Sequence, residues 1–207
     1  MRPAIILFAK APVAGRVKTR LEQALGAEAT LELHKAFVLD MLDKLLTLSA
    51  AAGIELHTDI RTEVWQRPEV VSRMQTGGDL GSRMLHALDG RWACIVGSDA
   101  PTLPVSHIEA LLASSADVAL GPCEDGGYYA ISCRRTHRDM FRGVEWSSER
   151  ALDQTEAAAR ACGLSVERGP GWYDVDRPED LRRLRDEGNL PEHTRRWFEG
   201  KDTPTAR

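Results

Sequence analysis

Residues 92–101 read WACIVGSDAP, an apolar run that ends abruptly in a serine, an aspartate and a proline. The uninterrupted apolar part, Trp92–Val96, is typical of a strand that is buried on both faces of a sheet. Asp99 follows at the carboxyl end of this strand, which is where open α/β sheets carry their ligand-binding groups. These residues therefore predict a central strand with a carboxylate at its functional end.

A basic loop follows a second apolar run, Pro3–Ala9. The loop carries one glycine and four cations, which are Lys10, Gly15, Arg16, Lys18 and Arg20. A glycine lets the backbone approach a phosphate closely, and the cations neutralise its charge. The loop matches neither the Walker A motif nor the Rossmann Gly-x-Gly-x-x-Gly pattern. It predicts either a phosphate-binding loop or a solvated basic turn that starts a helix.

Two further carboxylates lie near the end of the chain, where residues 173–180 read YDVDRPED. Because the carboxyl ends of parallel strands share one edge of a sheet, Asp99 and Asp176 are expected to lie close together and to hold Mg²⁺. Two structural alternatives remain open. Asp99 could form an Asx turn before the next proline, and Asp176 could cap the following helix with Glu179 as its capping-box partner.

Residues 124–128, which read EDGGY, join two expected strands. Asp-Gly is a strong signal for a hairpin turn, so turn geometry is expected here. The same loop could also contact an acceptor substrate. In that case Asp125 or Glu124 would serve as its ligand or as a general base.

Residues 75–81 read QTGGDLG and contain no cation suited to phosphate. A Gln side chain beside exposed backbone suits hydrogen bonding to the edge of a nucleotide base. The candidate base-binding residues are Gln75, Gly77, Gly78 and Asp79. A flexible loop is the structural alternative.

Strands and helices alternate along the chain, which favours an α/β fold with a mostly parallel central sheet. The expected strands are residues 3–9, 54–58, 70–74, 92–96, 117–120, 128–132 and 164–167. The expected helices are residues 26–52, 80–88, 104–113, 147–161 and 178–186, with Gly53 as the C-cap of the first. Together they predict a single three-layer domain over residues 1–187, followed by a polar tail, residues 188–207.

The composition is that of an ordinary globular protein, with 43% hydrophobic and 28% charged residues. A net charge of −4 gives no sign of general nucleic-acid binding. The four cysteines form no Cys-x-x-Cys pair, which favours reduced thiols, and the six histidines are scattered and are interpreted as structural or surface residues. No segment is long and apolar enough for a membrane span, so a cytoplasmic protein is expected, and the apolar residues of the tail leave room for a homodimer.

Taken in order, these motifs resemble the nucleotide-diphospho-sugar transferase superfamily with the GT-A fold. More closely, the chain is similar to a bacterial family of glycosyltransferase-like proteins, some of which are labelled arsenosugar-biosynthesis glycosyltransferases. The matching segments cover almost the whole chain: FAKAP (8–12), KTRL (18–21), GDLGSRM (78–84), GSDAP (97–101), DGGY (125–128), WSS (146–148) and DVDRPEDL (174–181).

The resemblance implies a role for each part of the site. Phosphates would lie on the basic loop, Mg²⁺ or Mn²⁺ on Asp99 and Asp176, and the base on Gln75 and residues 77–81. The leading prediction is a metal-dependent transferase that uses a nucleotide-activated sugar and a small-molecule acceptor. One alternative is nucleotidyl transfer from an NTP to a phosphorylated small molecule. Another is a non-catalytic nucleotide sensor.

Overall fold

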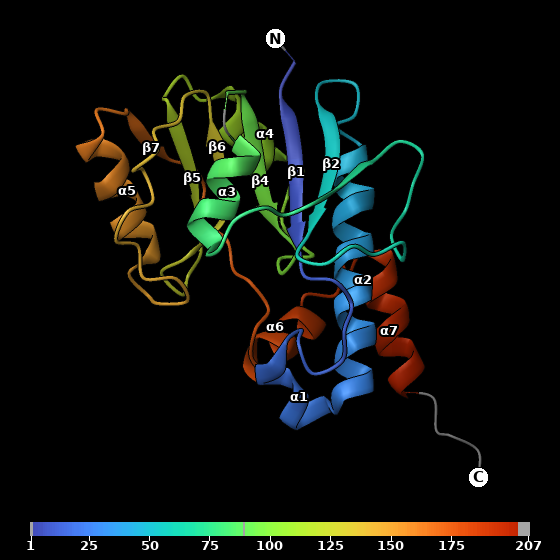
Figure 1. Ribbon diagram of the computed structural model, residues 1–207. Helices are drawn as coiled ribbons and strands as arrows, with labels where there is room; N and C mark the ends of the chain where they lie inside the picture. The colour runs from blue at the N-terminus through green and yellow to red at the C-terminus, as the bar shows by residue number, and fades with distance from the viewer. Residues whose placement is uncertain (1, 89, 203–207) are drawn as a thin grey trace.

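The computed structural model describes residues 2–88 and 90–202. Within them the chain forms a seven-stranded sheet of order β3-β2-β1-β4-β6-β5-β7 (Figure 1). Every pair of neighbouring strands is parallel except those of β6, which runs antiparallel to β4 and β5. The strands are β1 Ala4–Ala9, β2 Gly53–Thr58, β3 Val71–Met74, β4 Ala93–Gly97, β5 Val118–Pro122, β6 Tyr128–Cys133 and β7 Val166–Arg168. The expected α/β class with a mostly parallel sheet is confirmed.

Helices cover both faces of this sheet. They are α1 Thr19–Leu25, α2 Ala27–Leu46, α3 Leu80–Leu88, α4 Val105–Ala113, α5 Ala151–Ala161, α6 Pro178–Asp186 and α7 Glu192–Asp202. Side chains of α2 and α4 pack on one face, and side chains of α3 and α5 pack on the other. The described helices include none that is both long enough and apolar enough to cross a lipid bilayer.

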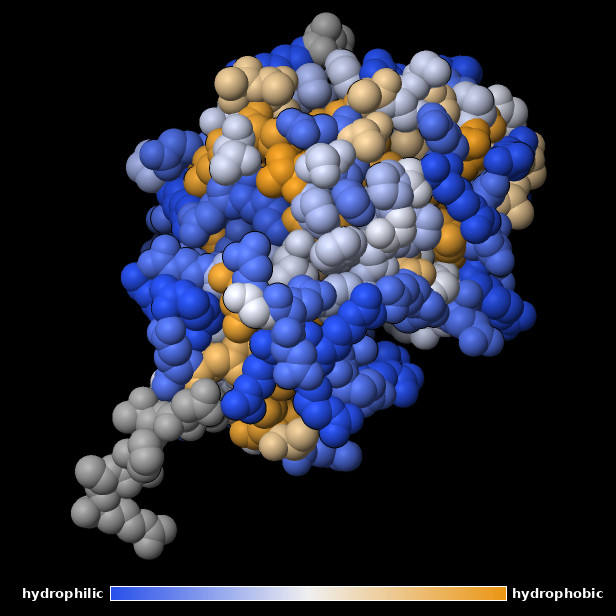
Figure 2. All heavy atoms as spheres, turned by 180° about the vertical axis from the view of Figure 1, so that it is seen from behind, coloured by the Kyte–Doolittle hydropathy of each residue, from blue (hydrophilic) through white to orange (hydrophobic). Residues whose placement is uncertain are grey.

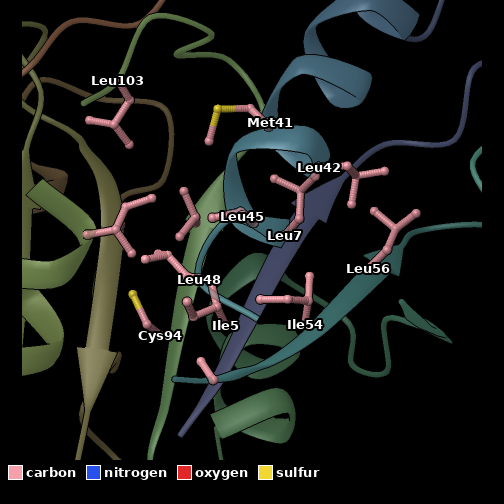
Figure 3. Close-up of a cluster of buried hydrophobic side chains, with 14 of the residues drawn as sticks. Ile5, Leu7, Met41, Leu42, Leu45, Leu48, Ile54, Leu56, Cys94 and Leu103 are labelled. Atoms are coloured by element: carbon pink, nitrogen blue, oxygen red, sulfur yellow. The ribbon is translucent and has the colours of Figure 1, made fainter. Parts of the chain in front are cut away.

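The central strand β1 supplies both cores because successive side chains of a strand point to opposite faces. Ile5 and Leu7 pack with α2, whereas Ile6 and Phe8 pack with α3. Figure 3 shows the α2 side, where leucines of the helix meet Ile5, Leu7 and the β2 side chains. Each fully buried side chain of this size stabilises the fold by about 1.5–3 kcal/mol.

A third apolar cluster lies beyond the carboxyl edge of the sheet. There α1 and α6 lie beside the N-terminal half of α2, which projects past the sheet (Figure 1). Leu21 of α1, Phe37 of α2 and Leu184 of α6 are buried in this cluster. It fixes the basic loop after β1 to the segment before α6. Two chain segments that are far apart in the sequence thereby meet at the edge of the sheet.

The first long helix ends earlier than the sequence pattern indicates. Helix α2 stops at Leu46, residues 47–52 form turns, and Gly53 starts β2 instead of capping the helix. The apolar periodicity continues because Leu48 and Ala52 remain buried inside those turns. Gly26, with φ 80°, separates α2 from α1, a short helix that has no separate sequence signal.

The capping of α6 also differs from the expectation. Pro178 occupies the first helical position, where its missing N–H costs nothing, so Arg177 is the N-cap residue instead of Asp176. The Asp180 carboxylate, rather than that of Glu179, accepts hydrogen bonds from the backbone N–H groups of Arg177 (2.8 Å) and Asp176 (3.1 Å). The carboxylate of Asp176 is therefore not used for capping.

Part of the expected tail is an ordered helix. Helix α7 packs along α2, and the buried Asp40 carboxylate accepts hydrogen bonds from the Thr194 hydroxyl (2.6 Å) and the Thr194 N–H (2.8 Å). Residues 203–207 of the expected tail lie outside the described residues. Figure 2 shows the molecule from behind, where the surface around α2 and α7 is mostly hydrophilic.

The cysteines of the chain carry free thiols, as the sequence predicts. Cys94 and Cys133 are buried in the sheet, whereas Cys123 and Cys162 are partly buried.

Large apolar side chains exposed at one edge of the sheet include Val71 and Met74 of β3.

Candidate functional site

A cleft of about 570 Å³ opens at the carboxyl ends of β1 and β4. Its volume lies within the range of small-molecule sites. The loop after β1, helix α3 and strand β6 contribute to its walls. The predicted site residues among its lining are Lys10, Lys18, Arg20, Gln75, Asp99 and Asp176.

Lys18 joins the two predicted metal ligands. Its Nζ lies 2.6 Å from Oδ1 of Asp99 and 3.3 Å from Oδ1 of Asp176, and it donates a hydrogen bond of 2.6 Å to the carbonyl of Val175. The side chain of Lys18 is only 2% exposed. All three ammonium donors therefore have protein partners.

The backbone of Lys18 is in the left-handed region, with φ 47°. This conformation costs a non-glycine residue about 1–2 kcal/mol. Such strain persists only where the surrounding contacts determine the conformation, and it occurs often at functional sites. Here the three contacts of the ammonium hold the residue in place.

Charge pairing keeps this cluster ionised. Burial alone would lower the pKa of Lys18, but the carboxylates of Asp99 and Asp176 outweigh it and raise the pKa. Burial would likewise raise the pKa of Asp99, but the Lys18 ammonium outweighs it and lowers the pKa. For nearby Asp174, burial, and then the charges of Asp125, Asp176 and Asp99, outweigh the Lys18 ammonium and raise the pKa to about 7.

The carboxylates of Asp99 and Asp176 also fit a divalent cation in kind. Their side chains are 43% and 36% exposed, so both can be reached from the cleft. Carboxylate oxygens are the ligands that Mg²⁺ and Mn²⁺ prefer, commonly one or two carboxylates together with substrate phosphates. An ion at this position would share the carboxylates with Lys18.

Asp59 organises the loop after β1. Its Oδ1 accepts a hydrogen bond of 2.6 Å from the N–H of Ala11, and its Oδ2 lies 3.5 Å from the guanidinium of Arg16. His34 adds a hydrogen bond of 2.9 Å to the carbonyl of Lys10. Sequence reasoning missed Asp59, although it follows strand β2 just as Asp99 follows β4, so the same signal could have found it.

The other residues of the basic loop lie at the mouth of the cleft or beside it. The side chains of Arg16 and Arg20 are 56% and 53% exposed. Arg20 lines the cleft and lies 3.6 Å from Oδ2 of Asp176, whereas Arg16 and Gly15 are outside the lining. Gly15 has φ 75°, and apart from its chain neighbours no described atom lies within 4 Å of the place that a Cβ would take, so there is open space on this side of its backbone. Two exposed cations and an accessible backbone thus flank the Lys18 cluster.

Of the predicted base-binding segment, Gln75 and Leu80 line the cleft. Nε2 of Gln75 donates to the carbonyls of His57 (3.0 Å) and Ala9 (3.3 Å), which leaves its side-chain oxygen as an acceptor. Asp79 instead accepts a hydrogen bond of 2.7 Å from the N–H of Ser82 at the start of α3. Gly77, Gly78 and Asp79 are not part of the cleft lining.

The loop that holds Glu124 and Asp125 is the expected hairpin turn between β5 and β6. The Glu124 carboxylate accepts two hydrogen bonds from Arg183, at 2.7 and 3.0 Å, and this arginine stacks on Tyr173. Oδ1 of Asp125 accepts a hydrogen bond of 2.8 Å from the N–H of Gly127. Both carboxylates lie outside the cleft lining, so their catalytic roles stay predictions.

Several lining residues were given no role in the site by the sequence analysis. They are Phe8, His34, Met84, Tyr128 and Tyr129. In the sequence they look like ordinary core residues of strands and helices, and most of them are indeed largely buried. Burial lowers the pKa of His34, which keeps its imidazole neutral near pH 7. Their position in the cleft follows from the packing of α2, α3 and β6 at the edge of the sheet.

The described residues form an α/β domain with a cleft at the carboxyl edge of its sheet, and its fold is that of the nucleotide-diphospho-sugar transferases, as a solved structure shows. A crystal structure from Desulfovibrio desulfuricans G20, of a protein provisionally classed as a nucleotide-diphospho-sugar transferase, is 30% identical with a TM-score of 0.86. The match covers 97% of this chain and 95% of that chain. The chain belongs to the DUF2064 family, described as "Uncharacterized protein conserved in bacteria", whose model matches residues 32–148.

More distant solved structures share the fold alone. The inositol-1-phosphate CTP transferase of T. maritima is 13% identical with a TM-score of 0.56, and the match covers 100% of this chain and 98% of that one. CMP:2-keto-3-deoxy-manno-octonic acid synthetase, solved with CTP, is 12% identical with a TM-score of 0.52 and coverages of 90% and 98%. No curated protein matches the chain.

Proposed function

We propose that this protein is a transferase that uses a nucleotide-activated sugar as its donor. The observation that carries the proposal is the buried Lys18 between Asp99 and Asp176, inside a cleft at the carboxyl edge of the sheet. Cations and carboxylates at that edge suit a donor that carries both phosphates and a metal ion. The 30% identical relative, provisionally classed as a nucleotide-diphospho-sugar transferase, supports the same interpretation.

In this proposal each part of the cleft has one task. The exposed guanidiniums of Arg16 and Arg20 close over the diphosphate, and Gln75 meets the base with its free side-chain oxygen. Lys18 fixes Asp99 and Asp176 in place and offsets their charge, so that these two carboxylates can hold Mg²⁺ or Mn²⁺. A bound metal ion supplies Lewis-acid stabilisation of the departing diphosphate.

The acceptor side of the proposal rests on the hairpin between β5 and β6. Asp125 is the better candidate for contact with an acceptor hydroxyl, because Glu124 is already bound by Arg183. Asp125, Asp174 and Cys123 place their polar side-chain atoms within 4.8 Å of one another. A carboxylate with a pKa near 7, such as that of Asp174, could accept a proton from the acceptor.

Nucleotidyl transfer from an NTP to a phosphorylated acceptor is the second candidate. The fold is shared with transferases that use CTP, and the same cations and carboxylates would serve this reaction. The two candidates differ in the product: glycosyl transfer releases a nucleoside diphosphate, whereas nucleotidyl transfer releases pyrophosphate. A protein that only senses nucleotides would release neither.

The experiment is a thermal-stability screen with NTPs and nucleotide sugars, each with and without Mg²⁺ or Mn²⁺, followed by chromatography of the products. A ligand at a hundred times its dissociation constant adds about 2.7 kcal/mol, which is roughly 5–10 °C for a domain of this size. We expect a metal-dependent shift with one nucleotide sugar. A shift with an NTP alone would favour nucleotidyl transfer, and no shift with any nucleotide would refute both.

Two variants test whether the thermal shift arises from nucleotide binding in the cleft. Asp99→Asn should abolish the metal-dependent part of the shift, because it removes one carboxylate of the pair. Asp139→Asn is the matched control, since this carboxylate pairs with the surface residue Arg138 and is outside the cleft lining. If both variants behave alike, the nucleotide binds elsewhere.

A further inference from the structure

A second hollow, of about 790 Å³, lies beside β2, β3 and α3. We call it the basic hollow, because its lining among the described residues contains four arginines and no aspartate or glutamate: Arg61, Arg73, Arg83 and Arg91. The chain between β2 and α3 loops around this end of the sheet (Figure 1). Arg83 lines both this hollow and the cleft, so the two sites are neighbours.

A buried carboxylate beneath the basic hollow orients two of the arginines. Glu55 of β2 is 7% exposed, and it accepts hydrogen bonds from Arg91 at 2.5 and 3.2 Å. Nε of Arg73 lies 3.3 Å from the same carboxylate, and Nε2 of His57 lies 2.8 Å from it. Burial would raise the pKa of Glu55, but His57 and Arg91 outweigh it and lower the pKa to about 2.

A structural role explains only part of this arrangement. Arg91 is held by Glu55 and by the carbonyl of Ala87, as expected for a buried ion pair. Arg61 has no ion-pair partner among residues 2–88 and 90–202. In the described part of the chain, Arg83 donates long hydrogen bonds to the carbonyls of Gly77 and Gly78, at 3.3 and 3.4 Å, and its charge also acts on the exposed Asp79 carboxylate without a close ion pair. The charges of these two arginines are therefore available to a ligand.

The basic hollow carries a local charge opposite to that of the whole chain. Four guanidinium groups line the hollow and two of them pair with the Glu55 carboxylate, whereas the chain as a whole has a net charge of −4. Charges of one sign in a concave wall focus the electric field and attract an oppositely charged small molecule. The side chain of Arg73 is 57% exposed, so its guanidinium can reach such a molecule.

The remaining lining supports a phosphate group as the ligand. Hydroxyl side chains of Thr62, Ser72 and Thr76 line the hollow together with the arginines. Guanidinium groups bind phosphate oxygens in paired hydrogen bonds, and hydroxyl groups can donate to the oxygens that remain. A hollow of this volume holds a small phosphorylated molecule rather than a polymer.

We propose that the basic hollow is a second anion site, which binds the phosphate group of a small molecule next to the nucleotide cleft. The molecule could be a phosphorylated acceptor or an effector, because both present the same phosphate chemistry. The site does not depend on the proposed transferase activity, since its residues are separate from Lys18, Asp99 and Asp176.

The test is calorimetric titration of the metal-free protein with pyrophosphate and with inorganic phosphate, at low salt and without nucleotide. The double variant Arg61→Gln/Arg73→Gln should weaken binding at the hollow at least tenfold. Arg138→Gln is the matched control, because this arginine is 88% exposed, pairs with Asp139 on the surface and is outside the lining of the hollow. Equal binding by wild type, control and double variant would overturn the proposal.

A second pair of measurements separates this hollow from the cleft. The variant Arg16→Gln/Arg20→Gln removes the two exposed arginines of the basic loop at and beside the mouth of the cleft, and it should leave binding at the hollow intact. Amide NMR shifts induced by pyrophosphate should appear at Ser72 and Thr76 in the wild type. Shifts confined to residues 15–20 would overturn the proposal, even if the double variant failed to fold.

Measurements of donor binding and of turnover distinguish a phosphorylated acceptor from an effector as the molecule that binds in the hollow. If an acceptor fills the hollow, Arg61→Gln/Arg73→Gln should raise the KM for the acceptor and leave donor affinity unchanged. If an effector fills it, pyrophosphate should change donor affinity in the wild type and not in the double variant. Because the titration needs no turnover, it can succeed even where the proposed transfer reaction fails.

Discussion

Replacing Lys18 by methionine probes the centre of the cleft. Methionine keeps the unbranched apolar stem, which can still pack near Phe37, whose ring centre lies 5.2 Å from the ammonium. The variant loses the ion pairs to Asp99 and Asp176 and the hydrogen bond to the carbonyl of Val175. Two carboxylates then face each other without the cation that separates them.

The structure gives the size of the expected loss. Removing one partner of a fully buried ion pair costs about 3–5 kcal/mol. Because the carboxylates of Asp99 and Asp176 are 43% and 36% exposed, water screens part of their repulsion, and we expect about 2–3 kcal/mol. For a domain of this size, the melting temperature should fall by roughly 4–12 °C.

Urea unfolding followed by circular dichroism measures this loss, at pH 7.5 with EDTA. The cycle of Lys18→Met, Asp99→Asn and the double variant should give a coupling energy of about 1–3 kcal/mol. Lys35→Met is the control, because Lys35 pairs with Glu32 one helical turn away on the surface of α2. A loss below about 0.5 kcal/mol for Lys18→Met would refute the buried cluster.

Three further substitutions test other parts of the molecule. Asp174 has a pKa raised from 3.8 to about 7, so the stability due to its neutral form is complete below pH 3.8 and is lost as the pH rises to 7. The free energy of unfolding of Asp174→Asn, measured with urea, should therefore rise by about 1–2 kcal/mol relative to that of the wild type between pH 4 and pH 7, after allowance for solvent screening. A difference between the two proteins that does not change with pH would contradict the raised pKa. Glu124→Gln should lower the free energy of unfolding by less than about 1 kcal/mol and change turnover little, because the ion pair of Glu124 with Arg183 of α6 is exposed. A tenfold loss of turnover would instead support a catalytic role for Glu124. Gly126→Ala should lower stability by more than about 3 kcal/mol, since φ is 85° and a Cβ would lie 2.0 Å from the carbonyl oxygen of Glu149, whereas Gly53→Ala, with open space around it, should be tolerated in the same thermal melt.

Local sequence patterns predicted most of the fold. The apolar runs of β1 and β4 stand out because both faces of these strands are buried, and α3 and α6 begin and end where their patterns do. The end of α2 could not be predicted, because buried Leu48 and Ala52 continue the helical spacing through turns. A pattern of apolar residues therefore indicates which side chains are buried, but it does not show whether their backbone is helical or forms turns.

The candidate site was predictable in its residue types and not in its pairings. Carboxylates after strands indicated Asp99 and Asp176, and both line the cleft. The sequence assigned Lys18 to phosphate, whereas its ammonium lies between these two carboxylates. Glu124 likewise meets an arginine 59 positions away. Such partners depend on how distant segments pack, which no local pattern encodes.

The contact between Lys18 and Val175 has a consequence for how the protein is made. These residues are 157 positions apart, and the N–H of Val175 also bonds to the carbonyl of Asp99 at 2.8 Å. On the ribosome the basic loop emerges early, but it cannot reach its final form until the segment before α6 has been translated. A chain that stops short of Val175 contains all the strands of the described sheet but lacks a partner of Lys18, so the cleft cannot be complete before the last part of the domain is present.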